Sequence, residues 1–391
     1  MKTNTIIFLF WLVVSFGIGK AQSPADPAEA FRQRITAKVE RVKEGVQTWM
    51  ASGRDPAAIL KAMQETVKPL FDDGKATEAE AELDRLLERL GGEKPLPADE
   101  KPLAGSEKSR AADDYQAFQN PERVVVKGYD GEVVDPFISR DGHYLFFNTT
   151  HFEPSKTALY YADRIDDLTF VYKGKIGGVN LDGVLTAVSS MDRDGNFYFI
   201  SPRSHEGALA TIHRGKFKDG VVTDIRPVLG LNRPGQISFD VEITADGSTL
   251  YFVDATMSGS KAPGAGPKSS HLAIAIRDGD GVKRLQNSAE LLAKVNTTEN
   301  LEYGACTSAD GLELFFDRFT VSSKSFGIWR AVRTSVGVPF GTPQRVAALD
   351  GFVEAQTLSP DGRSLYYQKR EGDRFVFYRV TRAAADLPAK K

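Results

Sequence analysis

The chain has 391 residues, of which 41% are hydrophobic and 26% are charged, and its formal net charge is −2. Length and composition are typical of a globular protein with one large and one smaller domain, or with two ordinary domains. A net charge so close to zero gives no electrostatic reason to expect nucleic acid or an anionic membrane as a partner. The single cysteine, Cys306, excludes an internal disulfide, and we interpret it as a small core residue.

The first 21 residues have the pattern of a secretory signal peptide. Lys2 precedes an apolar run from Ile6 to Ile18, and small residues follow at Gly19 and Ala21, where a signal peptidase would cleave. The run is short for a membrane span and a polar segment follows it, so an uncleaved anchor is the weaker alternative. We therefore predict a periplasmic or secreted protein with no stable membrane insertion after cleavage.

The segment 25–92 has helical periodicity. Apolar residues spaced by threes and fours form three stripes that predict three short helices: one with its stripe over 31–49, a second with its stripe over 59–70, and a third over 76–90. Asp55-Pro56 marks the start of the second helix, with Asp55 as its N-cap. The stripes must be buried, either in a small bundle or as a cap on a neighbouring domain. Residues 93–117 are rich in Pro, Gly, Ser, Lys and Glu and have no apolar periodicity, so we predict a linker there.

Beyond residue 117 one pattern recurs five times: a short strand, an Asp-Gly turn and an aromatic-rich strand. The copies occupy residues 136–147, 188–199, 241–252, 305–316 and 356–367. Their turn aspartates are Asp141, Asp194, Asp246, Asp310 and Asp361. The intervals are 53, 52, 64 and 51 residues, and a Gly/Pro/Ser/Lys-rich insertion at 257–270 accounts for the long one. A fixed period of this size predicts an array of supersecondary units, and Asp-Gly supplies the positive φ that a tight hairpin turn needs.

Further strands follow the aromatic strand of each unit. Third strands are predicted at 158–163, 208–214, 271–277, 326–333 and 375–382. More polar fourth strands follow in four units, at 170–176, 221–229, 281–286 and 344–349. Four strands per unit, repeated radially, predict an all-β propeller of five four-stranded blades over 118–383, preceded by the small α-helical region and followed by a tail at 384–391. The last unit lacks a fourth strand, and we predict that residues 123–127 supply it by pairing with 375–382.

The turn sequences carry a family resemblance. Ser359-Pro-Asp-Gly and Ser308-Ala-Asp-Gly, each followed by a Leu-Tyr-Phe-like strand, resemble the TolB-type, WD40-like (PD40) propeller repeat. Residues 300–382 are similar to bacterial exported PD40 proteins. In that family a Ser-Asn/Asp-Arg segment often follows the aromatic strand, and Phe316-Asp317-Arg318 preserves part of it. The resemblance covers about 118–383 and implies a propeller that acts as a binding or scaffold module.

Acidic residues lie in the segments that enter the predicted inner strands. Propellers bind ligands where the loops entering the inner strands meet the loops leaving the second strands, and we call this end the loop face. Acids that converge there would suit a cation or, in pairs, glycoside hydrolysis. The alternative is that they only hydrate a polar channel. The candidate residues are Asp135, Asp182, Asp240, Glu302 and Glu354.

We predict no metal and no cofactor, because the five histidines show no metal-ligand spacing. Arginine and aromatic residues of the later repeats, Arg318, Phe319 and Arg370, are the predicted ligand contacts. The chain is therefore expected to be a non-catalytic module that recognises an envelope protein, peptidoglycan or a glycan polymer at the loop face. The alternative is a carbohydrate-active enzyme that uses two or three of the five acids.

Overall fold

A computed structural model describes scattered positions between 35 and 49, residues 54–72 and 75–91, and residues 114–387 apart from 150–155, 206–209, 234, 258–266, 324 and 373. The predicted signal peptide at 1–21 lies outside these residues, as does most of the predicted linker. The chain divides into a helical unit and a strand-built unit. Within the part of the chain that the structure describes, no helix is long and apolar enough to cross a membrane.

The helical unit buries its three apolar stripes on one another, as a bundle does. Its fully described elements are α3 (Ala57–Ala62), the π-helical turn η1 (Met63–Val67), α4 (Lys68–Asp72) and α5 (Ala76–Gly91). The Asp55 carboxylate accepts the Ala57 amide at 2.9 Å, but the N-cap of α3 is Pro56, so the helix starts one residue later than predicted. Pro69 has no N–H and its ring would clash with the preceding turn, which explains why the helix widens just before it. The shared core consists of Ile35, Val39, Val42, Val46, Ile59, Leu60, Met63, Val67, Leu83 and Leu86.

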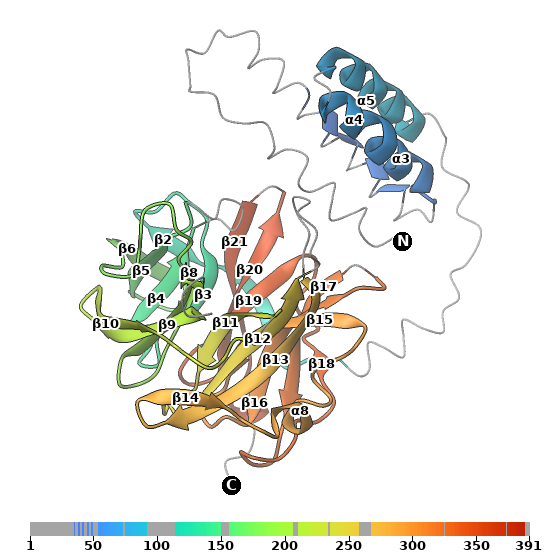
Figure 1. Ribbon diagram of the computed structural model, residues 1–391. Helices are drawn as coiled ribbons and strands as arrows, with labels where there is room; N and C mark the ends of the chain where they lie inside the picture. Colours follow the sequence, from blue (N-terminus) through green and yellow to red (C-terminus); the bar gives the residue numbers. More distant parts are fainter. Residues whose placement is uncertain are drawn as a thin grey trace. The chain divides into compact units, whose positions relative to one another are not determined.

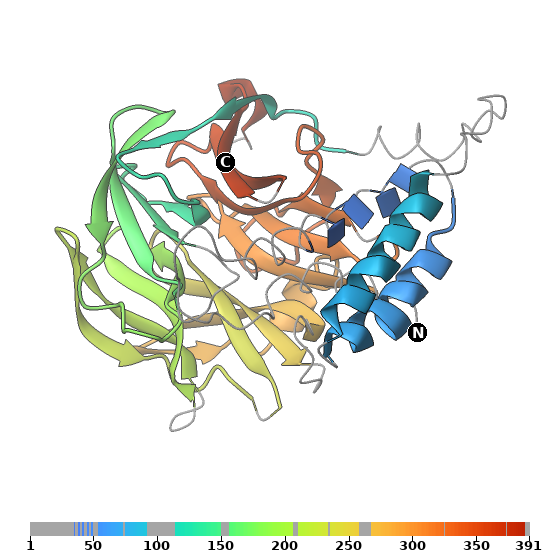
Figure 2. The ribbon, with the colours of Figure 1, turned by 90° about the horizontal axis from the view of Figure 1, so that it is seen from above.

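The strand-built unit is a five-bladed β-propeller, as predicted (Figure 1). The first four blades are β3–β6 with β2 added at the edge, β7–β10, β11–β14 and β15–β18, and the fifth is β19–β21 with β1. The inner strands β3, β7, β11, β15 and β19 each contact their two neighbours around the axis. Figure 2 shows the blades following one another around this ring, from the teal and green first blades through yellow and orange to the red last blade.

The described strands have the following bounds: β1 Gln119–Arg123, β2 Val125–Lys127, β3 Val134–Ile138, β4 Tyr144–Asn148, β5 Leu159–Arg164, β6 Thr169–Lys175, β7 Ala187–Met191, β8 Asn196–Ser204, β9 Ala210–Lys218, β10 Val221–Pro227, β11 Ile237–Ile243, β12 Thr249–Met257, β13 Pro267–Asp278, β14 Gly281–Arg284, β15 Asn300–Thr307, β16 Glu313–Thr320, β17 Ser325–Val332, β18 Gln344–Arg345, β19 Val353–Leu358, β20 Ser364–Glu371 and β21 Arg374–Thr381. Two short helices, α8 (Ser288–Leu291) and η2 (Ala384–Asp386), accompany them. Aromatic side chains of the second strands, such as Phe147, Phe252 and Phe316, are fully buried between blades, which is the packing that the repeat predicts.

The ring closes as predicted, but with different bounds. β1 (Gln119–Arg123) pairs antiparallel with β21 and completes the last blade. The predicted closing strand at 123–127 is therefore wrong in its limits, because Val125–Lys127 forms β2 and pairs parallel with β6 of the first blade. The valines that suggested a single strand have another role: Val124 and Val126 are buried in the core between the last and first blades. The register of a strand is set by which of its faces is buried. Here the buried valines lie where the chain crosses from the last blade to the first, so their alternation does not mark one strand.

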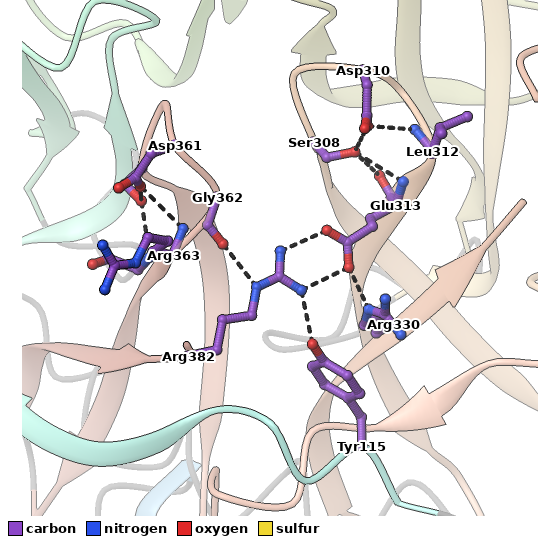
Figure 3. Close-up of polar contacts among 12 residues, drawn as sticks. Tyr115, Ser308, Asp310, Leu312, Glu313, Arg330, Asp361, Gly362, Arg363 and Arg382 are labelled. Atoms are coloured by element: carbon purple, nitrogen blue, oxygen red, sulfur yellow. Dashed lines mark hydrogen bonds and ion pairs between the residues drawn. The ribbon is translucent and has the colours of Figure 1, made fainter. Parts of the chain in front are cut away.

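A buried ion-pair network ties the last blade to the fourth (Figure 3). Arg382 donates to both carboxylate oxygens of Glu313, at 2.8 and 2.6 Å, and the two side chains are 0% and 1% exposed. Arg330 donates to the same carboxylate at 2.5 Å, and Arg382 also donates to the Tyr115 hydroxyl at 2.8 Å. Tyr115 bridges to Val346, so strand pairing in the propeller includes a residue of the segment 93–117 that the sequence predicts as a linker.

The Asp-Gly turns form as predicted, and their glycines have φ between 69° and 78°. In four blades a Ser or Thr two residues before the turn aspartate donates its hydroxyl to that carboxylate, as Ser308 does to Asp310 at 2.6 Å. The second blade has Asp192 at this position, which accepts the amides of Asp194 and Asn196. All five turns lie at the same end of the ring, which we call the turn end. The loop face is the opposite end.

Candidate binding site at the propeller axis

Each inner strand carries one bulge at an equivalent place. The bulge residue lies six positions before the turn aspartate and has a left-handed backbone, with φ between 43° and 58°. For a residue with a side chain this conformation costs about 1–2 kcal/mol, so neighbouring groups must stabilise it. All five bulge residues are half-buried, whereas most residues that follow them on the inner strands are buried. In chain order they are Asp135, Val188, Asp240, Gly304 and Ala355.

Polar side chains of the preceding blade hold four of these bulge amides. The amide donors and their acceptors are Asp135 to Gln368 (2.7 Å), Val188 to Asn148 (3.1 Å), Gly304 to Asp240 (2.9 Å) and Ala355 to Asp317 (2.9 Å). Three of the acceptors, Asn148, Asp317 and Gln368, occupy the same place on their second strands, seven residues after the turn aspartate. The bonds join adjacent blades and satisfy backbone groups that the bulges remove from the strand ladder.

Four carboxylates gather around the axis on the loop-face side. They come from three inner strands and one second strand, and we call them the axial carboxylate cluster: Asp135, Asp240, Asp317 and Glu354. Burial raises the pKa of Asp317 well above its usual range, and the three other carboxylates of the cluster raise it further. Burial also raises the pKa of Asp135 to about 7, although a hydrogen bond with Asn148 partly opposes the shift. Both shifts mean that the charged carboxylates are destabilised here unless a cation compensates their charge.

The other groups around the cluster are amide and phenol side chains. Glu354 accepts Gln368 Nε2 at 2.9 Å and the Tyr303 hydroxyl at 3.1 Å. Gly304 provides the room for Asp317: a Cβ on this residue would lie 2.1 Å from Asp317 Oδ2, and its φ is +58°. Both the close approach and the left-handed backbone require glycine here.

The turn end of the axis is built differently. Arg140, beside the first Asp-Gly turn, donates to Glu242 of the third blade at 2.7 Å and to the Ile243 carbonyl at 2.6 Å. Glu242 also accepts the Ser190 hydroxyl at 2.8 Å and the Thr307 amide and hydroxyl, both at 3.0 Å. The Arg140 and Glu242 side chains are 8% and 3% exposed. A buried ion pair and its hydrogen bonds thus join the first, second, third and fourth blades.

The predicted acids fall into two groups. Asp135, Asp240 and Glu354 come together in the axial carboxylate cluster, whereas the other two do not join it. Glu302 is fully buried and accepts Arg318 Nε and the Thr297 hydroxyl, both at 2.9 Å. Asp182 is exposed in the connection between the first and second blades.

The predicted ligand contacts lie in the fourth and fifth blades. Arg318 is buried, bonded to Glu302, and stacked 4.6 Å from the Trp329 ring centre. Phe319 is 8% exposed and packs on Phe326 at 4.8 Å between ring centres. Arg370 is half-buried and donates to the Gly372 carbonyl at 3.1 Å. None of the three belongs to the axial carboxylate cluster.

Sequence reasoning did not single out Asp317 as an axial residue, and the repeat does contain the signal that finds it. Aligning the blades on the turn aspartate places the bulge residue at −6 and its polar partner at +7. A polar residue seven positions after one turn aspartate therefore predicts a contact at the axis with the bulge residue of the next blade. Within the described residues, no three His, Cys, Asp or Glu side chains are arranged to hold a metal ion.

Comparison with known proteins identifies no family: no family model and no curated protein sequence matches this chain. Similar solved structures include TolB from Acinetobacter baumannii, at 17% identity and a TM-score of 0.36 over 64% of this chain. They also include an endo-arabinase from Bacteroides thetaiotaomicron, at 10% identity and a TM-score of 0.41 over 67% of this chain and 98% of that one. A GH62 α-L-arabinofuranosidase catalytic domain from Coprinopsis cinerea has 12% identity and a TM-score of 0.42 over 68% and 96%. This chain spans 54% of the TolB chain's length.

Proposed function

We propose that this protein is an exported binding module that recognises a cell-envelope ligand, a glycan, peptidoglycan or a protein, at the loop face of its propeller. The observation that carries the proposal is the axial carboxylate cluster on the loop-face side, opposite the buried Arg140–Glu242 pair at the turn end. A few polar groups converging on a scaffold of rigid strands are what ligand recognition needs. Export rests on the signal-like pattern of residues 1–21.

Binding is favoured over catalysis because the carboxylates already have structural partners. Asp240 and Asp317 accept amides of bulge residues, and Glu354 accepts two side-chain donors. A glycosidase needs two carboxyl groups that reach the scissile bond, one to protonate the leaving group and one to act as base or nucleophile. Asp317 is only 2% exposed, which suits a group that closes the bottom of a recognition site.

The proposal is tested by retention on defined polymers. Purified protein would be incubated with a panel of polysaccharides, peptidoglycan and purified envelope proteins, and the bound fraction measured. We expect one class to be retained by the wild type and by Asp194→Asn, a matched change in an exposed turn-end carboxylate. Asp317→Asn should reduce retention. Failure to retain any member, or equal retention by Asp317→Asn, would contradict the proposal.

One observation favours the second candidate, a carbohydrate-active hydrolase. A carboxyl group with a pKa of about 7, as burial gives Asp135, can act as general acid at neutral pH when a second carboxylate is close. This candidate predicts new reducing ends from a polysaccharide, and their loss in Asp135→Asn. If no substrate in the panel yields reducing ends, the hydrolase candidate fails and the binding proposal is unaffected.

A further inference from the structure

Two buried oxygen atoms beside Gly304 lack a hydrogen-bond donor. Within the part of the chain that the structure describes, nothing donates to Asp317 Oδ1 or to Gln356 Oε1. The two residues are 2% and 5% exposed. Gln356 Nε2 donates to the Gly304 carbonyl, which identifies the other amide atom as the acceptor oxygen. Asp317 Oδ2 occupies the space that a Cβ on Gly304 would need. Both unpaired acceptors therefore belong to side chains that contact Gly304, next to the axial carboxylate cluster.

Unpaired acceptors of this kind are costly in a folded protein. A buried polar group without a partner destabilises the fold by about 1–3 kcal/mol, and native proteins rarely retain one without a reason. The surrounding charge is also one-sided, because the charges that act on Asp317 most strongly are the three other carboxylates of the cluster. Two unpaired acceptors among carboxylates are suited to a positively charged donor from outside the chain.

We propose that the axial carboxylate cluster receives a primary ammonium group of the ligand, with Asp317 Oδ1 and Gln356 Oε1 as its acceptors. This inference rests on the proposed function, since it names the chemistry of the group that the loop face would recognise. An ammonium group is a compact charge with three donors, so it can serve both unpaired oxygens and one more carboxylate. A guanidinium is a wide planar fork that needs coplanar acceptors, and a hydroxyl would leave the negative charge unbalanced.

The choice of an ammonium over a metal ion also has a structural basis. Among the described residues, no group of three His, Cys, Asp or Glu side chains has the arrangement of a metal site. One of the two free acceptors is the amide oxygen of Gln356, which serves a hydrogen-bond donor as well as it would a cation. Two ligand sources carry primary amines in suitable form, amino sugars and lysine side chains, and the test separates them.

The experiment measures binding of two matched pairs of compounds to the full protein by calorimetry at neutral pH. One pair is a glucosamine tetrasaccharide and its N-acetylated form; the other is a blocked Gly-Lys-Gly peptide and its Nε-acetylated form. Loss of one charged hydrogen bond corresponds to roughly tenfold to a hundredfold weaker binding. We expect this loss when the preferred amine is acetylated, and a similar loss in Asp317→Asn and Gln356→Met. Asp194→Asn should bind like the wild type.

The amine pair that shows the preference identifies the source, sugar or peptide. Asp317→Asn retains an oxygen for the Ala355 amide, and melting of each variant would establish that it is folded. The inference is overturned if neither amine binds, if acetylation leaves the affinity unchanged, or if folded Asp317→Asn keeps the amine preference. Retention of a polymer regardless of its acetylation would overturn the ammonium inference while the binding proposal stands. Failure to retain any polymer or protein would instead contradict the proposed function.

Discussion

Each end of the propeller axis buries an acidic side chain, but the two ends surround that side chain differently. At the turn end, Glu242 is buried but accepts four hydrogen bonds, one of them from the Arg140 guanidinium. At the loop face, Asp317 is equally buried, yet its charged neighbours are carboxylates and one oxygen has no donor among the described residues. The same five inner strands line both ends. The difference therefore lies in the side chains: Glu242 has a cationic partner, whereas the charged neighbours of Asp317 are carboxylates, and in our proposal a ligand supplies the missing cation.

The comparison also shows where the protein can tolerate change. A buried charge with its partner is strongly coupled to the fold, because removing the partner leaves an uncompensated charge. A buried charge without a partner already destabilises the fold, so neutralising it should help stability and harm recognition. The predictions below test this contrast, from the largest expected effect to the smallest.

The largest effect is expected from Glu242→Ala. The change leaves the Arg140 charge buried without its partner and removes the acceptor of Ser190 and Thr307, so we expect a loss of about 3–5 kcal/mol in the free energy of unfolding. Urea denaturation at pH 7 measures it. A loss below about 1 kcal/mol would mean that the turn end is not the stabilising end and would break the comparison.

Gly304→Ala should have an intermediate effect. The new methyl group would meet Asp317 Oδ2, and the residue would have to keep a φ of +58°. We expect a loss of roughly 1–3 kcal/mol from the left-handed backbone and the displaced carboxylate, together with weaker ligand retention. Gly372→Ala, whose Cβ would meet nothing within 4 Å at a similar φ of +63°, is the matched control for the backbone term. Equal losses in the two variants would show that Asp317 is not displaced.

The pH dependence of stability should differ between wild type and Asp317→Asn. The folded state holds protons on Asp135, with its pKa of about 7, and on Asp317, whereas the unfolded state has released them above about pH 4. This contribution is complete below the unfolded pKa and is lost as pH rises through the folded values. Burial of His213 lowers its pKa to about 4 and gives the opposite trend between pH 4 and 6.5, but this term cancels between the two proteins.

We therefore expect the stability of Asp317→Asn relative to wild type to increase steadily from pH 5 to pH 8. Urea midpoints at four pH values would record the trend. A constant difference across this range would contradict the pKa direction given for Asp317.

The smallest effect is expected from Arg123→Ala. Its ion pair with Glu371 has a 3.2 Å separation, and the two side chains are 60% and 40% exposed. An exposed pair of this kind contributes about 0–1 kcal/mol, although Arg123 lies in the strand that closes the ring. A loss well above this range would indicate that the closing strand depends on its side chains more than on its backbone pairing.

Most of the fold could be predicted from sequence because the propeller repeat is a local pattern. Each Asp-Gly turn determines its own hairpin, and five turns at a regular interval count the blades. The bounds of the closing strand could not be read in the same way. Val124 and Val126 alternate as residues of one strand would, but they are buried between the last and first blades. Alternation in sequence does not distinguish a strand of one blade from a segment that crosses between two blades.

The site was predictable only in part, since it depends on contacts between blades. Asp135, Asp240 and Glu354 lie at or beside bulges of the inner strands, so their position in the repeat correctly predicted that they approach the axis. Asp317 reaches the axis from a second strand to hold the bulge of the next blade, which no single repeat reveals. Glu302 looked equivalent to the other acids, but it lies two residues before its bulge and pairs with Arg318.

The central claim is that the two axial acids have opposite roles, and one paired measurement tests it directly. Glu242→Gln and Asp317→Asn make the same conservative change at the two ends of one axis, and urea denaturation at pH 8 compares their free energies of unfolding with wild type. The account predicts opposite signs: Glu242→Gln is less stable than wild type and Asp317→Asn is equally or more stable. If both variants lose stability to the same extent, the loop-face carboxylate is a structural group like its counterpart, and the account is contradicted.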